Sequence, residues 1–220
     1  MAGGKKNTIN FEFVKGRLKE RYADYSPQTK VRFFESLYAD NPTNENKYSF
    51  ISALQSNGQT EEALKLISEI LNKFPKNLIL NITKSEILLS GQRLDDAKQI
   101  IDEVLKISPN NYPASILKSK ILSAKKETIK AEEILRDLLI SKNRNPSLWM
   151  QLSEVQRAGK NIVGYHLSRG EYFTLIGDFD NALNQFQFAL SLSGNSFQTS
   201  ETIMTKIKFV QSRLAKRRGI

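Results

Sequence analysis

The chain has 220 residues and a formal net charge of +10, from 33 Lys and Arg against 23 Asp and Glu. Glycine and proline number only 11 and 6, which is below average usage and favours long helices joined by short loops. The lack of cysteine excludes a disulfide framework, a zinc finger and a thiol nucleophile. The sequence has no stretch of about 18 apolar residues that would predict a membrane-spanning helix. It also starts without the apolar segment of a secretory signal.

The two ends of the chain are expected to be tails. Residues 1–7 are predicted to be disordered or a remnant of cloning, and residues 218–220 form the second tail. The region between them is only mildly basic, which is weak support for a nucleic-acid partner. Five of the ten excess positive charges lie in or beside the tails: Lys5, Lys6, Lys216, Arg217 and Arg218.

Residues 8–217 are predicted to form a single repeat domain, beginning with a helix from about residue 8. Phe33, Leu37 and Pro42 resemble the second half of a degenerate unit. The clearest units occupy residues 44–145 and repeat every 34 residues, a length that holds two helices and two turns. The columns with this period are Ala63, Ala97 and Ala131; Pro75 and Pro109; Leu71, Leu105 and Leu139; Ile67, Ile101 and Leu135; and Ser85, Ser119 and Ser153.

These columns have a physical interpretation. Small residues such as Ser85 and Ala97 are expected where the two helices of a unit cross, because bulky side chains would force the backbones apart. Gly58 and Gly91 are expected at the turn inside a unit, where glycine adopts a left-handed backbone at low cost. The repeated prolines end the second helix of each unit, and Asn77 and Asn110 are expected to cap the helices that follow. Acidic pairs are expected as solvated charges at the starts of second helices: Glu61–Glu62, Asp95–Asp96 and Glu132–Glu133.

This pattern resembles tetratricopeptide repeats. Trp149 occupies the fourth position of the next unit, where that family often has tryptophan, and it is expected in the core. The segment from Gly177 to Ala182 restates the turn-plus-alanine motif, but it follows Ala131 after one and a half periods. A single helix at about residues 160–176 is therefore expected to serve two units, and about 196–217 to form a capping helix. The resemblance implies an all-α, right-handed superhelical solenoid of about twelve antiparallel helices.

Catalytic chemistry is not evident in the sequence. His166 is the one histidine, and it is expected to be packed or hydrogen-bonded rather than a metal ligand. No His-Glu-x-x-His helix or glycine-rich phosphate loop occurs. We therefore expect this chain to be no enzyme by itself and to carry no metal or cofactor.

A repeat solenoid is expected to bind protein or peptide partners on the concave surface formed by its first helices. The carboxylate clamp of chaperone-binding tetratricopeptide repeats is absent, because Tyr48 and Ser52 occupy the corresponding places. The mixed apolar and polar surface favours an extended peptide or a partner's surface. This predicted binding face consists of Tyr48, Ser52, Gln55, Ile82, Glu86, Leu89, Ile116, Lys120, Ser123, Met150, Glu154 and Arg157.

The last third is similar to the C-terminal repeats of bacterial zinc metalloproteases related to the periplasmic beta-barrel assembly-enhancing protease. The similarity extends over roughly residues 8–217 but covers only the repeat region of that family. Gly170 departs from the family's usual alanine, and the catalytic zinc domain and signal peptide are missing from this sequence. The residues that carry the resemblance are His166, Arg169, Glu171, Tyr172, Gly177 and Ala182.

The resemblance implies a non-catalytic recognition domain of a periplasmic zinc metalloprotease. Such repeats engage outer-membrane proteins or the machinery that assembles them, and they restrain access to the protease site. Two alternatives remain open: a free-standing repeat scaffold for an envelope complex, and a nucleic-acid binder that uses the basic C-terminal tail. The second predicts binding that falls steeply with salt.

Overall fold

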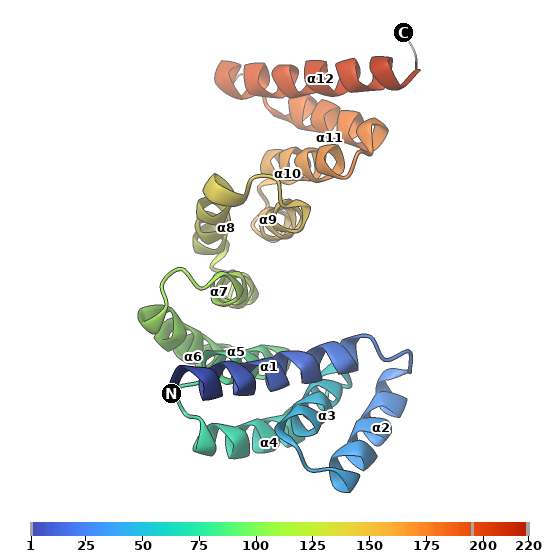
Figure 1. Ribbon diagram of the computed structural model, residues 1–220. Helices are drawn as coiled ribbons and strands as arrows, with labels where there is room; N and C mark the ends of the chain where they lie inside the picture. Colours follow the sequence, from blue (N-terminus) through green and yellow to red (C-terminus); the bar gives the residue numbers. More distant parts are fainter. Residues whose placement is uncertain (1, 195, 219–220) are drawn as a thin grey trace. The chain divides into compact units, whose positions relative to one another are not determined.

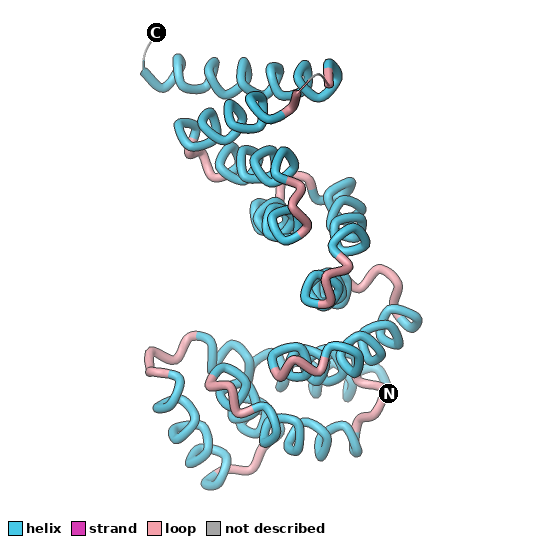
Figure 2. Tube along the Cα trace, turned by 180° about the vertical axis from the view of Figure 1, so that it is seen from behind, coloured by secondary structure: helices cyan, strands magenta, loops and turns pink. Residues whose placement is uncertain are grey.

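The computed structural model describes residues 2–194 and 196–218, which form twelve α-helices and no strand (Figure 1). Short loops join the helices (Figure 2). The all-α architecture with about twelve helices is therefore confirmed. The helices are α1 (Ala2–Arg21), α2 (Pro27–Asp40), α3 (Asn44–Ser56), α4 (Thr60–Lys73), α5 (Leu78–Ser90), α6 (Leu94–Ile107), α7 (Tyr112–Ala124), α8 (Thr128–Lys142), α9 (Pro146–Ala158), α10 (Ile162–Leu175), α11 (Phe179–Leu192) and α12 (Phe197–Arg218).

The chain divides into two compact units, Met1–Leu117 and Lys118–Ile220, with the boundary inside α7. They are called unit 1 and unit 2 below. The single domain predicted over residues 8–217 stays a prediction, because an array held by neighbour packing separates readily into such units. The first helix, expected from about residue 8, begins at Ala2.

Small residues lie where two helices of a unit cross, as predicted. In unit 1, the buried Ser85 hydroxyl of α5 donates a 2.8 Å hydrogen bond to the carbonyl of Ala97, which is buried on α6. The Asn77 side chain caps α5 by accepting a hydrogen bond from the Leu80 amide. Asn110 was expected to cap α7, but the neighbouring Asn111 accepts the equivalent bond from the Ala114 amide. The period explains this correction, since Asn111 follows Asn77 by 34 residues and directly precedes α7.

The turns inside the units have left-handed residues at the same 34-residue period. Gly58 has the expected positive φ of 76°, but the next left-handed residue is Gln92 (φ 60°) and not Gly91. Gly91 has φ −81°, and its small size allows a close approach instead, because an added Cβ would lie 2.5 Å from Thr60 Cγ2. The later positions of the series are Lys126 (φ 65°) and Lys160 (φ 58°).

Helix α10 packs against both α9 and α11, as expected for a helix shared between two units. Gly170 is buried where α10 meets α11, and an added Cβ would lie 2.3 Å from the Phe186 ring. The departure from alanine at this position therefore has a structural cause. Helix α12 packs against α11 and coincides with the helix expected at about residues 196–217, whose capping role stays a prediction. The core of the last helices consists of Ala182, Phe186, Ala189, Ile203, Val210 and Leu214.

Two expectations about single residues are wrong. Trp149 is only half-buried, and its indole N–H donates a 2.6 Å hydrogen bond to the carbonyl of Asn143, just beyond α8. Glu132 lies in the second turn of α8 and not at its start. Its carboxylate accepts hydrogen bonds from Gln156 (2.9 Å) and Arg136 (2.6 Å), so it connects α8 to α9. Burial alone would raise the pKa of Glu132, but these hydrogen bonds outweigh it and lower the pKa.

Candidate functional site

The predicted binding face is covered in unit 1. The cover is α1, which packs along α3 and reaches α5 (Figure 1). An open surface was expected here, but this half of the face is occupied by the chain's own first helix. Three of its six residues on α3 and α5 are buried, Tyr48, Ser52 and Ile82, and three are half-buried, Gln55, Glu86 and Leu89.

Phe13 is the apolar anchor of α1. Its side chain is fully buried, and its ring centroid lies 5.4 Å from that of Tyr48 and 6.3 Å from that of Phe74. These distances are typical of favourable aromatic pairs. The ring therefore fills the space between α3 and the end of α4.

Arg17 continues the same contact one turn further along α1. Its Nη2 donates a 3.3 Å hydrogen bond to Thr83 Oγ1 and forms an ion pair with Glu86. Burial alone would lower the pKa of Arg17, but Tyr48 and Glu86 beside it raise the pKa, so the guanidinium stays charged. Burial raises the pKa of Tyr48, which keeps its hydroxyl protonated and hydrogen-bonded to the Thr83 hydroxyl.

The backbones of α1 and α3 approach closely at Gly16. An added Cβ there would lie 2.5 Å from the carbonyl oxygen of Glu45, and the Ser49 hydroxyl donates a 3.0 Å hydrogen bond to the Gly16 carbonyl. The Glu45 carboxylate forms ion pairs with Lys15 (2.9 Å) and Lys19 (3.3 Å). Burial alone would raise the pKa of Glu45, but the two lysines lower it. The contact between α1 and α3 is thus matched in shape and in charge.

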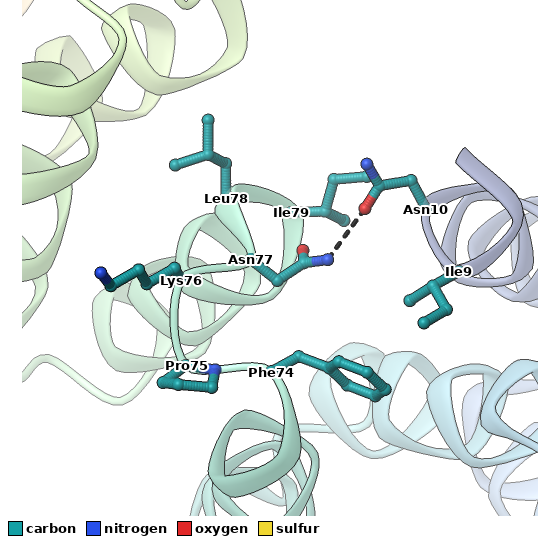
Figure 3. A pocket seen from close by; sticks show the side chains of 8 residues that line it. All are labelled: Ile9, Asn10, Phe74, Pro75, Lys76, Asn77, Leu78 and Ile79. Atoms are coloured by element: carbon teal, nitrogen blue, oxygen red, sulfur yellow. Dashed lines mark hydrogen bonds between the residues drawn. The ribbon is translucent and has the colours of Figure 1, made fainter. Parts of the chain in front are cut away.

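A pocket of about 460 Å³ lies beside the first part of α1 (Figure 3). Asn77 Nδ2 donates a 2.8 Å hydrogen bond to Asn10 Oδ1 across it. Most of the lining is apolar and it contains no carboxylate or histidine, so the pocket suits an apolar side chain better than chemistry on a substrate. The lining residues are Ile9, Asn10, Phe74, Pro75, Lys76, Asn77, Leu78 and Ile79.

The rest of the predicted face lies on α7 and α9. Glu154 and Arg157 of α9 are exposed and form a 2.9 Å ion pair with each other. Met150 is half-buried on the same helix and contacts Arg169 of α10. On α7, Lys120 is exposed, whereas Ser123 and, in unit 1, Ile116 are half-buried.

The helix that carries the family resemblance, α10, directs its four residues to different neighbours. His166 Nδ1 forms a 2.9 Å hydrogen bond with Gln185 of α11, and its ring lies 5.4 Å from that of Phe188. Glu171 forms an ion pair with Lys206 of α12. The Tyr172 ring meets Phe173 edge-on. Arg169 instead reaches α9, so the surface of Met150, Glu154, Arg157, Tyr165 and Arg169 is called the α9–α10 face below.

Metal binding and membrane spanning find no support in the part of the chain that the structure describes. No three His, Asp or Glu side chains come together there as metal ligands. None of the described helices is long and apolar enough to cross a membrane. The expectation that His166 is packed and hydrogen-bonded is confirmed.

Comparison with known families supports a tetratricopeptide-repeat domain. Residues 54–107 and 88–154 match the tetratricopeptide repeat family. No curated protein is similar enough in sequence to be matched with the chain.

Solved structures of similar fold include two tetratricopeptide-repeat proteins and MamA. One from Parabacteroides merdae is 17% identical with a TM-score of 0.55, covering 92% of this chain and 84% of its own. A thermophilic one from Thermus thermophilus is 18% identical with a TM-score of 0.54, covering 90% and 98%. MamA from Desulfovibrio magneticus RS-1 is 14% identical with a TM-score of 0.52, covering 85% and 96%. At these identities the likeness concerns the fold alone, and the predicted tetratricopeptide-repeat solenoid is confirmed.

Proposed function

We propose that this chain is a protein-binding repeat scaffold and that its partner binds on the α9–α10 face. One observation carries the proposal: α1 covers the equivalent face of unit 1 and leaves none of its six residues exposed, whereas Glu154 and Arg157 stay exposed on α9. Tetratricopeptide repeats bind proteins or peptides, so a face left open is the expected place for a partner.

Charge supports the same half of the chain. Residues 118–220 contain 17 Lys and Arg against nine Asp and Glu, whereas residues 1–117 contain 16 against 14. A partner of unit 2 is therefore expected to be acidic, because complementary charge speeds association and excludes basic competitors.

Site-directed photocrosslinking in the source cells tests this proposal. A benzophenone amino acid at Arg157 is expected to crosslink a protein. The matched control is the same amino acid at Glu133, an exposed position on α8 that is expected to give no such product. Equal yields at the two positions, or none at either, would contradict a partner on the α9–α10 face.

We further propose that the scaffold serves a periplasmic zinc metalloprotease and engages outer-membrane proteins or their assembly machinery. The support is the resemblance carried by His166, Arg169, Glu171 and Tyr172. Affinity purification from periplasmic extracts is expected to recover outer-membrane proteins together with a His-Glu-x-x-His polypeptide. Recovery of an envelope complex without any such polypeptide would favour a free-standing scaffold. The isolated chain is expected to leave casein uncut in the presence of zinc.

A further inference from the structure

Arg169 has unusual surroundings for a half-buried arginine. It lies on α10 between Tyr165 and Phe173, each one turn away. Its guanidinium carbon is 6.0 Å from the Tyr165 ring centroid and 5.0 Å from that of Phe173. Rings at these distances attract the cation through their faces.

The guanidinium lacks a partner of adequate strength. Its Nη1 contacts the thioether sulfur of Met150 at 3.6 Å, and a thioether is a weak acceptor. Its Nε is buried without any hydrogen-bond acceptor. An arginine carries five N–H donors, and a buried donor without a partner is costly enough to need an explanation.

Neighbouring carboxylates do not supply the missing acceptor. Glu171, two residues along α10, pairs with Lys206 of α12. Glu154 on α9 pairs with Arg157. Both acidic residues that α9 and α10 contain are thus engaged elsewhere, and Arg169 makes no ion pair within the described chain.

We infer that Arg169 binds a carboxylate of the partner, as the anchor of an acidic peptide on the α9–α10 face. The planar guanidinium matches a carboxylate through paired N–H···O bonds, which are stronger than hydrogen bonds between neutral groups. Tyr165, Phe173 and Met150 provide apolar surface around it for the adjoining part of the peptide. The positive excess of residues 118–220 favours the same anionic ligand. This inference rests on the proposed function and names its ligand class.

Peptide titration of the full chain tests the inference. The probes are a labelled Gly-Ser-Ala-Leu-Phe peptide with a free C-terminal carboxylate, its C-terminal amide, and the amide with Glu in place of Ala. Comparison of the first and third probes shows whether the site binds a terminal carboxylate or the carboxylate of an acidic side chain. At least one carboxylate probe is expected to bind about tenfold tighter than the neutral amide, in line with a charged hydrogen bond. The Arg169 Nε–H resonance is expected to shift as that probe binds.

Variants connect the binding to Arg169. Arg169→Gln is expected to remove the tenfold preference, and Arg169→Lys to restore only part of it because lysine lacks the paired donors. Lys208→Gln removes one positive charge from an exposed position on α12, outside the α9–α10 face, and is the matched control, with binding unchanged within about twofold. Helical circular dichroism checks that each variant is folded.

Several outcomes would overturn the inference. They are equal binding of amide and carboxylate probes, wild-type affinity in Arg169→Gln, or an equal loss in Lys208→Gln. Binding of a DNA oligonucleotide that depends on Arg169, without binding of the carboxylate probes, would also overturn it. Crosslinking from position 157 is independent of these titrations. A protein crosslink that persists in the Arg169→Gln chain would refute the carboxylate anchor and leave the proposed function intact.

Discussion

Replacing Phe13 with alanine tests whether α1 is a separately held cover on the repeats. Phe13 is fully buried between Tyr48 and Phe74, so truncating its ring removes the main apolar contact of α1. A Phe→Ala change in a core costs about 3–5 kcal/mol. Because α1 is the first helix of the chain, we expect it to open alone while the repeats stay folded. A loss of about 3 kcal/mol raises the opening equilibrium about 100-fold.

Hydrogen exchange read by mass spectrometry measures this opening directly. In Phe13→Ala, amides of α1 are expected to exchange about 100-fold faster, whereas those of α10 and α11 keep their protection. Phe11→Ala is the matched control, because Phe11 lies on the same helix but is 66% exposed. Its effect on stability is expected to stay within about 0.5 kcal/mol. Unchanged α1 exchange in Phe13→Ala, or simultaneous unfolding of all helices, would refute the reasoning.

Five further substitutions address the packing, the turns and the charges. Gly170→Ala is expected to lower the free energy of unfolding by about 1–3 kcal/mol, because its Cβ meets the Phe186 ring. Adding Phe186→Leu to this variant is expected to recover part of the loss, as measured by urea unfolding. Lys160→Gly is expected to raise the free energy of unfolding slightly, by up to about 1 kcal/mol, because it relieves a left-handed lysine. Gly177→Ala, at φ 80°, is expected to lower it. Glu45→Gln is expected to destabilise the packing of α1 at pH 7. The pKa of Glu45 is held below its usual 4.5, so the wild-type carboxylate is protonated only at acid pH. The difference in stability between wild type and variant should therefore disappear as the pH falls through that lowered pKa. A difference that persists at acid pH would contradict the ion-pair account.

The helices and their pairing were predictable from the sequence because they depend on residues close together in the chain. The period predicts that Ser85 lies against Ala97 and that Asn77 caps α5, and both contacts are found. The same logic failed where residue type and backbone disagree. Gln92 adopts the left-handed conformation next to Gly91, since the turn fixes the position and glycine is needed instead for the approach to Thr60.

The cover over unit 1 was not predicted because its contacts join residues far apart in sequence. Arg17 meets Thr83 and Glu86 across 66 and 69 positions, and no local pattern indicates such a pair. One sign was available: Phe13, Gly16 and Arg17 share a helix face with spacings of three and four residues. A glycine on such a face allows a close approach to another helix, as Gly16 makes to the backbone of Glu45.

The contrast between Arg17 and Arg169 bears on where a partner binds. Both are partly buried arginines beside tyrosines, one on α1, the helix that covers unit 1, and the other on the α9–α10 face. Arg17 has its carboxylate, Glu86, from within the chain, whereas Arg169 has only a sulfur and two rings. A buried arginine needs a hydrogen-bond acceptor, and Arg17 of α1 finds its acceptor, Glu86, within the chain. The ligand of unit 2 must bring its own acceptor, which is why an acidic peptide fits there and a basic one does not.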